Sequence, residues 1–486
     1  MIKVISITEE VLLRGGGKVK AIYNRLNGFS EMDGFSAILM TTAHSVEQKL
    51  DIESLRKEGT LAPEVKHFTL PELCAPVAIT EGVKLFNGFP DFDNAKKQGS
   101  KIVYSRDGKI VMKDDNKKSP VGTITDRKVV NGKNTIHFTL LNGFIINKIV
   151  NNSDGTTETT DYAESRPIRW LKTKNDKYLV GKNLITGRLC RTQKALARNL
   201  LEMVELQDTV TFVDGIKGSY LSNVIKTPRA LFLHAEHRDQ KGVLLPVYKK
   251  FVDDFDGQAI ITATNVHKKE IELDLKPSQE VAVIPHYYEA KPVKPQKRKN
   301  IITISRLDLS GKPIDECIKA FAKIKKEFPD VDYLIYGKGS GGKELTALIK
   351  RLKCQNRIKL MGYTKEPLAE FNGALASLYP TLTEGFGLSI LESLSAACPV
   401  ITYDVKYGPQ EMIKSGSNGY LIKPGKVDDI AEAIRKVLLD PEKYSKSCSD
   451  GLERYTRQTY LNNYKNLVEK LVENNRSARA VEKADA

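Results

Sequence analysis

The sequence has few of the features that mark membrane, secreted or metal-binding proteins. No run approaches the roughly 18 apolar residues that a membrane-spanning helix needs, so we expect none. The opening residues, Met1–Glu10, lack the long apolar stretch and cleavage site of a signal peptide. Six scattered cysteines form no C-x-x-C pair, which argues against a zinc site or a disulfide framework. We therefore expect a cytoplasmic protein.

Positive charge, in contrast, is in excess. The 486 residues include 76 Lys and Arg against 60 Asp and Glu, a net charge of +16 that favours polyanionic partners or an anionic membrane surface. Residues 63–191 hold 22 of these basic residues against 14 acidic ones, which is half of the excess. No nucleic-acid-binding motif accompanies the charge, so we expect no nucleic-acid partner. Alternatively, the basic residues only solvate a surface.

The first part of the chain predicts an α/β domain interrupted by an insertion. Residues 1–62 contain an apolar strand, a glycine run and an amphipathic helix, the opening of a doubly wound domain. In residues 63–191, short β-like runs flank turn dipeptides such as Asp107-Gly108 and Asn131-Gly132. These turns predict an antiparallel β meander inserted into the first domain.

The remaining chain predicts the completion of that domain and a second α/β domain. Helix and strand patterns return in residues 192–290, and a polar, proline-bearing connector over residues 290–300 predicts a domain boundary. Residues 291–456 alternate strands and helices, with a helix expected to begin at its cap, Asp428. Residues 457–474 predict a last helix that packs back on the first domain, and residues 475–486 predict a flexible tail.

The segment Glu384-Gly-Phe-Gly-Leu-Ser-Ile-Leu-Glu392 joins a glycine-bearing loop to an amphipathic helix. Unpaired N–H groups at a helix start favour a diphosphate, and Gly385 and Gly387 let the backbone approach it. Eight helical residues span about 12 Å, the scale that separates the sugar from the ribose of a nucleotide sugar. Two glutamates at this spacing are common by chance, so the argument depends on the whole segment.

Cations follow the first strand of the second domain. Arg306 and Lys312 come after a strand predicted over Asn300–Ile304, and ligands of open α/β sheets bind beyond such strand ends. Arg306 could bind a diphosphate bidentately and Lys312 as a point charge. The alternative is a pair of ordinary surface cations.

Other short motifs are ambiguous by themselves. Gly15-Gly16-Gly17 fits a phosphate or acceptor loop as well as a tight turn. His234 and His237 follow a strand without the H-E-x-x-H spacing of a zinc helix, so we expect no metal there. The D-x-D triplets at Asp91 and Asp254 follow no clear nucleotide-binding strand, and we expect solvated carboxylates.

Together these segments resemble the retaining glycosyltransferases of family 4, which have the GT-B fold. The resemblance covers residues 1–60 and 190–474 through motifs, and it implies two Rossmann-like domains facing a cleft. One departure concerns Lys312, which lies six residues after Arg306 where the family more often has five. A one-residue insertion in the loop would explain the shift.

The resemblance also implies roles for individual residues. It assigns catalysis to Arg306, Lys312, Glu384 and His237, with no metal and no cofactor beyond the UDP-sugar donor substrate. Further residues would bind the donor through backbone atoms or hydroxyl contacts: Gly16, Gly17, Gly362, Tyr363, Gly385, Phe386, Gly387, Leu388 and Glu392.

The acceptor follows from the subgroup and the charge. The sequence resembles bacterial wall-teichoic-acid α-glycosyltransferases, which implies transfer from UDP-glucose or UDP-N-acetylglucosamine to poly(glycerol phosphate) or poly(ribitol phosphate). Alternatives are transfer to a serine-rich repeat adhesin and a catalytically silent GT-B partner subunit. We expect peripheral contact with the inner face of the membrane and a homo-oligomer paired through strand edges. The basic residues expected to bind the acceptor are Lys113, Lys117, Lys118, Arg127 and Lys128.

Overall fold

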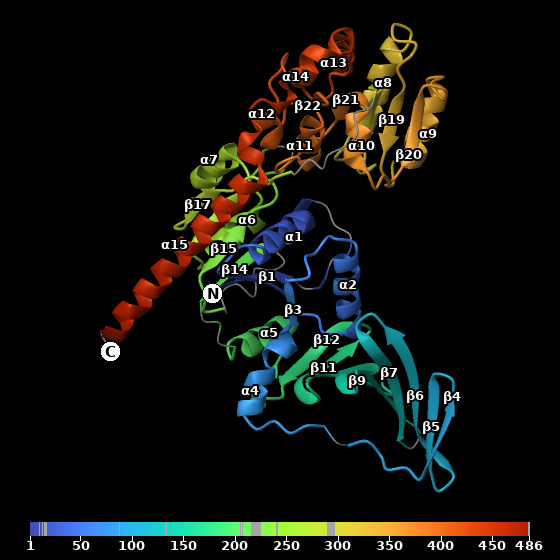
Figure 1. Cartoon of the computed structure of the whole chain (residues 1–486), viewed down its shortest axis with the longest axis vertical. Coiled ribbons are helices and arrows are strands. Elements are labelled where there is room, and N and C mark those ends of the chain that lie inside the picture. The colour runs from blue at the N-terminus through green and yellow to red at the C-terminus, as the bar shows by residue number, and fades with distance from the viewer. Residues whose placement is uncertain are drawn as a thin grey trace. The chain divides into compact units, whose positions relative to one another are not determined.

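The computed structural model describes most of the chain and divides it into two compact units (Figure 1). The first unit comprises Met1–Phe232, Phe255–Gln258 and Val468–Ala486, and the second comprises Leu233–Asp254 and Ala259–Leu467. The described residues are all except Glu9, Leu12, residues 14–16, Asn87, residues 132–133, Glu205, Gln207, residues 215–224, 240–241, 289–296 and 485–486.

Parallel strands form the α/β part of the first unit, in the order β15-β14-β1-β2-β3. These strands are β1 Ile2–Thr8, β2 Phe35–Thr41, β3 Lys66–Thr69, β14 Thr209–Asp214 and β15 Arg229–Phe232. The helices of this part are α1 Gly17–Ser30, α2 Val46–Lys57, α3 Leu70–Leu73, α4 Ala75–Thr80 and α5 Gln193–Leu201. Arg25 of α1 is fully buried and binds Asp214 and Ser6, which fixes the helix against the sheet.

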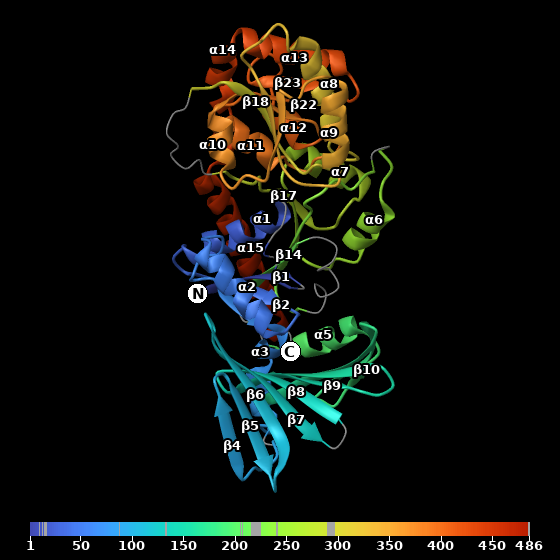
Figure 2. The same ribbon diagram turned by 90° about the vertical axis from the view of Figure 1, so that its right-hand side faces the viewer.

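The predicted β meander is confirmed as a ten-stranded antiparallel sheet that runs from β4 to β13 in chain order (Figure 2). Asp107 and Gly108 both have positive φ and turn β5 into β6, as a D-G hairpin requires. Helix α5 packs against β12. The strands are β4 Asn94–Gln98, β5 Lys101–Arg106, β6 Lys109–Ser119, β7 Gly122–Asn131, β8 Asn134–Leu141, β9 Phe144–Asn151, β10 Thr156–Ala163, β11 Arg166–Lys174, β12 Lys177–Asn183 and β13 Leu189–Cys190.

A six-stranded parallel sheet forms the centre of the second unit, in the order β20-β19-β18-β21-β22-β23. Its strands are β18 Asn300–Ile304, β19 Tyr333–Tyr336, β20 Ile358–Gly362, β21 Ala374–Tyr379, β22 Val400–Tyr403 and β23 Gly419–Ile422. Helices α8 and α13 pack side by side on it (Figure 1). The helices are α8 Ile314–Ile324, α9 Gly342–Arg351, α10 Pro367–Asn372, α11 Leu388–Ser395, α12 Gly408–Met412, α13 Val427–Leu439 and α14 Pro441–Lys446.

The second unit also contains a pair of parallel strands, β16 and β17. The segments around this pair are α6 Pro246–Asp253, β16 Ala259–Thr262, α7 Asn265–Asp274 and β17 Glu280–Val283. Helix α7 carries His267, Glu270 and Asp274, which contribute to the buried network described below.

Two helix boundaries differ from the sequence prediction. Helix α13 begins at Val427 after Lys426, so Asp428 lies in the first turn and is not the cap. Helix α15 extends over Arg457–Ala484, beyond the end predicted at residue 474, because Ala, Arg, Glu and Lys near its end favour a helix. The flexibility of residues 475–486 remains a prediction. Arg476 of α15 binds Asp208 in the first unit.

The domain boundaries remain predictions. The expected boundary near residue 290 falls among residues 289–296, outside the described part of the chain. None of the described helices has the length and apolar character needed to cross a membrane.

Candidate functional site

Lys312 and Glu384 form the centre of the candidate site in the second unit. The Nζ atom of Lys312 lies 3.0 Å from Oε2 of Glu384 and 2.7 Å from Oγ1 of Thr381. Tyr379 donates its hydroxyl proton to the same Glu384 oxygen over 2.7 Å. Lys312 follows β18, whereas Tyr379 ends the neighbouring strand β21, so the cluster lies at the carboxyl ends of parallel strands.

A turn delivers Lys312 to this place despite its shifted spacing. The backbone N–H of Lys312 donates to the carbonyl of Asp308 over 2.7 Å. Ser310 donates its hydroxyl proton to the Asp308 carboxylate, and this bond lowers the pKa of Asp308. Leu382 donates its N–H to the carbonyl of Gly311 and joins the turn to the segment before Glu384. These bonds bring Lys312 to Glu384 within one compact turn, while the proposed one-residue insertion remains a prediction.

Burial makes the environment of Lys312 distinctive. Only 9% of the residue is exposed, and its ammonium lies 4.5 Å from the centroid of the Tyr379 ring. Burial, followed by the adjacent Glu384 carboxylate, raises the pKa of Tyr379 well above its usual value, so the hydroxyl keeps its proton and remains a donor. The cluster thus offers a cation, a carboxylate and hydroxyl groups within one partly desolvated site.

The loop between Glu384 and α11 depends on a close backbone contact at Gly385. A Cβ atom at this position would lie 2.3 Å from the carbonyl oxygen of His234, so a larger residue requires the backbone to move. Phe386 is buried and packs edge-on against His286, whose ring stacks with that of His234. Gly387 is the N-cap residue of α11, and Leu388 begins the helix.

Glu392 lies on α11 and is buried, with 5% of the residue exposed. Its negative charge acts on Tyr288, whose pKa is raised to about 12 mainly by burial and further by Glu392. Glu392 also contributes to the raised pKa of Tyr379, after the larger effects of burial and Glu384. The two glutamates of the predicted motif therefore influence a common group from different positions.

Arg306, Gly362 and Tyr363 lie around the carboxyl ends of the sheet strands. Arg306 is exposed in the loop after β18, and its positive charge acts on Tyr379. The carbonyl of Gly362 accepts the N–H of Gly337 over 2.7 Å at the end of β19. Tyr363 is 69% exposed, so its side chain is available to a ligand. Direct ligand contact by these residues remains a prediction.

His237 lies in a buried network. It has no exposed surface, and its Nε2 lies 2.7 Å from Oδ2 of Asp274 on α7. Its Nδ1 is 3.5 Å from the hydroxyl of Tyr407, and its ring stacks on His267. Direct contact between His237 and a sugar therefore remains a prediction, while His234 is partly exposed and touches Gly385 through its carbonyl oxygen.

The five basic residues predicted to bind the acceptor do not share one face of the antiparallel sheet. Lys113 pairs with Lys128 across β6 and β7, and with Lys117 they share a face because alternate residues point the same way. Lys118 points to the other face with Arg127, whose guanidinium binds Asp114 bidentately. We therefore limit the lysine face to Lys113, Lys117 and Lys128, all exposed.

Of the remaining predicted residues, some lie within the described part of the chain and Gly16 does not. Gly16 lies outside the described residues, and Gly17 is the first residue of α1. The second D-x-D triplet contributes to ion pairs, Asp254 with Lys250 and Asp256 with Arg229. The described residues contain no group of at least three His, Cys, Asp or Glu side chains suited to a metal. The absence of a metal requirement remains a prediction.

The sequence did not assign Tyr379, Thr381 or Tyr407 to the site, and the segment that contains Tyr407 was expected only to be scaffolding near the nucleotide. Tyr379 and Thr381 both bind Lys312, from positions that follow a recognisable strand. Their place at a strand end of an α/β domain was the signal that could have identified them. Tyr407 offered no such signal, because its partners come from distant parts of the sequence.

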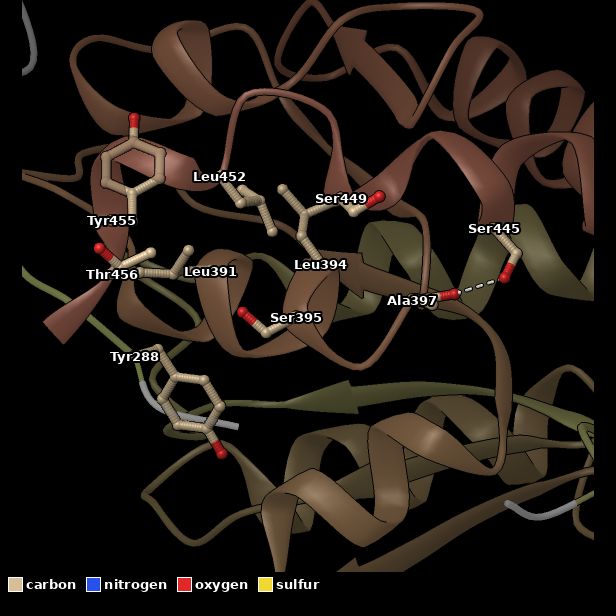
Figure 3. Close-up of a pocket in the computed structure, with 10 residues that line it drawn as sticks. All are labelled: Tyr288, Leu391, Leu394, Ser395, Ala397, Ser445, Ser449, Leu452, Tyr455 and Thr456. Carbon is tan, nitrogen blue, oxygen red and sulfur yellow. Dashed lines mark hydrogen bonds between the residues drawn. The ribbon is translucent and has the colours of Figure 1, made fainter. Parts of the chain in front are cut away.

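A separate pocket of about 260 Å³ lies against α11 (Figure 3). Leu391 and Leu394 of the helix line it together with Tyr288 and Tyr455, while Ser445 donates a hydrogen bond to the Ala397 carbonyl. None of the predicted site residues is among its lining residues. The pocket is therefore distinct from the Lys312–Glu384 cluster.

Parallel α/β architecture, a glycine-bearing loop before α11 and a cation–carboxylate cluster at strand ends are the features of a ligand site in an open α/β sheet. Residues 287–451 match the family model described as "Glycosyl transferases group 1", which confirms the predicted resemblance. A structure of an S. aureus TarM mutant, in complex with fondaparinux, alpha-GlcNAc-glycerol and UDP, superposes with a TM-score of 0.72 at 20% identity. The match covers 96% of this chain and all of that one, and it confirms the GT-B fold.

Curated relatives give the comparison at the level of sequence. The poly(glycerol-phosphate) alpha-glucosyltransferase of Bacillus subtilis (strain 168) is 33% identical over 198 residues, 39% of this chain and 29% of that protein. The UDP-N-acetylglucosamine–peptide N-acetylglucosaminyltransferase GtfA subunit of Streptococcus parasanguinis is 26% identical over 319 residues, 60% of this chain and 62% of that protein. The chain thus spans less than two thirds of the length of either relative.

Proposed function

We propose that this chain is a retaining α-glycosyltransferase that moves glucose or N-acetylglucosamine from UDP to a polyanionic acceptor. The observation that carries the proposal is the Lys312–Glu384 cluster at the carboxyl ends of β18 and β21. Departure of UDP leaves negative charge on the β-phosphate, and fixed cations aimed at that charge stabilise the transition state. Arg306 and Lys312 fit this role, and the N–H groups at the start of α11 supplement it.

The glutamates would have separate tasks in this reaction. Glu384 would bind the donor sugar, because it lies beside Lys312 in the loop, and Glu392 would bind the ribose hydroxyls from α11. The acceptor hydroxyl would attack from the side on which the phosphate departs, so retention needs no protein nucleophile. No metal or other cofactor enters this scheme, because the cations of the chain take the leaving-group role.

The acceptor that we propose is wall teichoic acid, poly(glycerol phosphate) or poly(ribitol phosphate). Two features support this acceptor: the relationship to the Bacillus subtilis glucosyltransferase and the net charge of +16. On the lysine face, the directly opposed Lys113 and Lys128 repel each other, and a phosphate between them would relieve the repulsion. Asp115 and Asp126 form the next opposed pair, so charges alternate along this face.

The alternatives concern the acceptor and the activity. The likeness to the Streptococcus parasanguinis GtfA subunit favours a serine-rich repeat protein as the second candidate acceptor. A silent GT-B partner subunit is the third reading, and the assembled Lys312–Glu384 cluster argues against it. We further propose a cytoplasmic location with peripheral membrane contact and assembly into a homo-oligomer, supported by the basic surface and the antiparallel sheet.

The test begins with hydrolysis of UDP-glucose and UDP-N-acetylglucosamine, with and without EDTA. Release of UDP from one of them, unaffected by EDTA, is the expected result. Transfer to purified poly(glycerol phosphate), poly(ribitol phosphate) and a serine-rich peptide then identifies the acceptor. Absence of both hydrolysis and transfer with all donors and acceptors would support the silent-subunit reading.

A further inference from the structure

Tyr407 occupies a buried position between segments of the second unit that are distant in sequence. The residue has no exposed surface and immediately precedes α12. Its ring stacks on His267 of α7 with centroids 4.4 Å apart. A buried tyrosine usually bonds its hydroxyl to a partner, so its contacts reveal what it connects.

Backbone contacts join Tyr407 to the candidate catalytic loop, residues 384–387, which precedes α11. Its N–H donates to the carbonyl oxygen of Glu384 over 3.1 Å. The next residue, Gly408, packs so closely on this loop that an added Cβ would lie 1.6 Å from the carbonyl oxygen of Phe386. Movement of Tyr407 would therefore be transmitted to the backbone of Glu384.

The side chain of Tyr407 joins the same segment to α7. Its hydroxyl donates to Oε2 of Glu270 over 2.9 Å, while the Lys406 ammonium binds the other oxygen of that carboxylate. A second contact connects α12 with α7, because Val266 donates its N–H to the Glu411 carboxylate. Removal of the hydroxyl would leave the Glu270 oxygen without its donor and loosen this connection.

His237 lies beside the Tyr407 hydroxyl and pairs with Asp274 of α7. Asp274 accepts hydrogen bonds from Arg238 and His237, and the bonds from Arg238 are the largest cause that lowers the pKa of Asp274. An ionised Asp274 has no proton to donate, so Nε2 of His237 carries the shared proton. Nδ1 of His237 lies 3.5 Å from the Tyr407 hydroxyl, whose one proton is donated to Glu270, so this contact adds packing to the network.

We propose that Tyr407 is a positioning residue for Glu384: it holds the catalytic loop against α7 and the His237–Asp274 pair. This inference rests on the proposed glycosyltransferase function. The described hydrogen bonds of the Lys312 ammonium do not involve Tyr407, so Tyr407 acts through the backbone of Glu384 and Phe386. The competing explanation is that Tyr407 stabilises the fold without affecting the site.

Tyr407→Phe tests the proposal because it keeps the ring and removes one hydroxyl. Tyr403→Phe is the matched control: Tyr403 is also buried, and its hydroxyl donates to Glu316 on α8. We expect Tyr407→Phe to lower kcat of UDP-sugar hydrolysis about tenfold with little change in KM, the effect of one misplaced hydrogen bond. Tyr403→Phe should lose similar thermal stability and keep its kcat.

A double-mutant cycle locates the effect. Glu270→Gln retains an acceptor for Tyr407, so it should keep more activity than Glu270→Ala. Tyr407→Phe combined with Glu270→Ala should cost less than the product of the single effects, because both break the same connection. Equal loss of kcat in Tyr407→Phe and Tyr403→Phe, or no loss in either, would overturn the positioning role.

Hydrogen exchange separates this inference from the proposed function. Tyr407→Phe should speed exchange in peptides that contain Glu384–Leu388, whereas Tyr403→Phe should leave these peptides unchanged. Unchanged exchange in Tyr407→Phe refutes the positioning role even if the enzyme is active. If the wild-type chain hydrolyses no UDP-sugar, the proposed function fails while faster exchange of the loop still supports the structural connection.

Discussion

The Nζ atom of Lys312 lies 3.0 Å from Oε2 of Glu384, although the two residues are 72 positions apart in the sequence. The carboxylate holds the ammonium in place before any ligand arrives, and Thr381 and Tyr379 add further contacts. Such preorganisation avoids part of the cost of arranging charges during a reaction.

Replacement of Lys312 by Ala should lower kcat of UDP-sugar hydrolysis by ~10²–10³, the usual loss for one transition-state donor. The matched control is Lys319→Ala, which removes another lysine paired with a carboxylate, that of Asp315 on α8. Steady-state kinetics of both variants provide the measurement. A Lys312→Ala variant as fast as Lys319→Ala would show that the turn does not deliver the ammonium to the phosphate.

Arg306→Ala should lower kcat by a similar ~10²–10³ while the melting temperature stays unchanged. The melting temperature should not change because Arg306 is exposed in the loop after β18. Arg351→Ala, an exposed arginine at the end of α9, controls for the loss of one positive charge. Kinetics near those of the wild type in Arg306→Ala would refute the diphosphate assignment.

Replacement of each glutamate by Gln should separate the two carboxylates by their kinetic effects. Glu392→Gln should mainly raise KM for the donor, because a ribose contact is shared by the ground and transition states. Glu384→Gln should mainly lower kcat, because this carboxylate would lie at the reacting sugar beside Lys312. Initial rates over a range of donor concentrations test the division, and an effect on KM alone in both variants would contradict it.

Neutralisation of the lysine face by Lys113→Gln, Lys117→Gln and Lys128→Gln should weaken transfer to long polymer while UDP-sugar hydrolysis continues. Polymer binding should also become less sensitive to salt, since fewer counterions are exchanged. Lys118→Gln, on the opposite face of β6, is the control. Polymer transfer that equals this control at low and moderate salt would leave the lysine face without a role in binding.

Acidification should destabilise the second unit through His267. Burial, with a smaller contribution from the charge of nearby His237, lowers the pKa of His267 from 6.5 to about 3. Between pH 3 and pH 6.5 the unfolded chain binds more protons at His267 than the folded chain does. The contribution of this residue to the free energy of unfolding is therefore fully present above pH 6.5 and decreases as the pH falls toward 3. The contribution lost between pH 7 and 5 is about 2 kcal/mol.

Urea unfolding of the wild type and His267→Phe at pH 7 and pH 5 measures this contribution. Phenylalanine keeps a ring beside Tyr407 but does not titrate, so the free energy of unfolding should fall less in the variant. Equal decreases in the two proteins would show that protonation of His267 does not contribute to acid destabilisation.

Local patterns predicted much of the fold. The strand Asn300–Ile304 has the predicted bounds, because a buried apolar run between turns is a strong local signal. The hairpin at Asp107-Gly108 was equally clear. The sequence placed the helix cap at Asp428 instead of Lys426, because Asp is favoured in the first turn of a helix as well as at its cap.

Long-range partners explain what the sequence could not reveal about the site. Arg127 looked like the neighbouring lysines, yet the register of β6 and β7 places it opposite Asp114, where its charge is matched. His237 looked available to a ligand, yet Asp274 of α7 binds it in the interior. In both cases the deciding residue comes from another element, so no local pattern identified it.

The close contact between Gly385 and His234 restricts which residue a homologous sequence can have at this position. Every side chain larger than hydrogen at position 385 would overlap the His234 carbonyl oxygen, because the added Cβ would be only 2.3 Å away. A homologue with another residue there must have rebuilt this loop. The residue at this one position can therefore identify homologues whose backbone differs between Glu384 and α11, including those that have kept both glutamates.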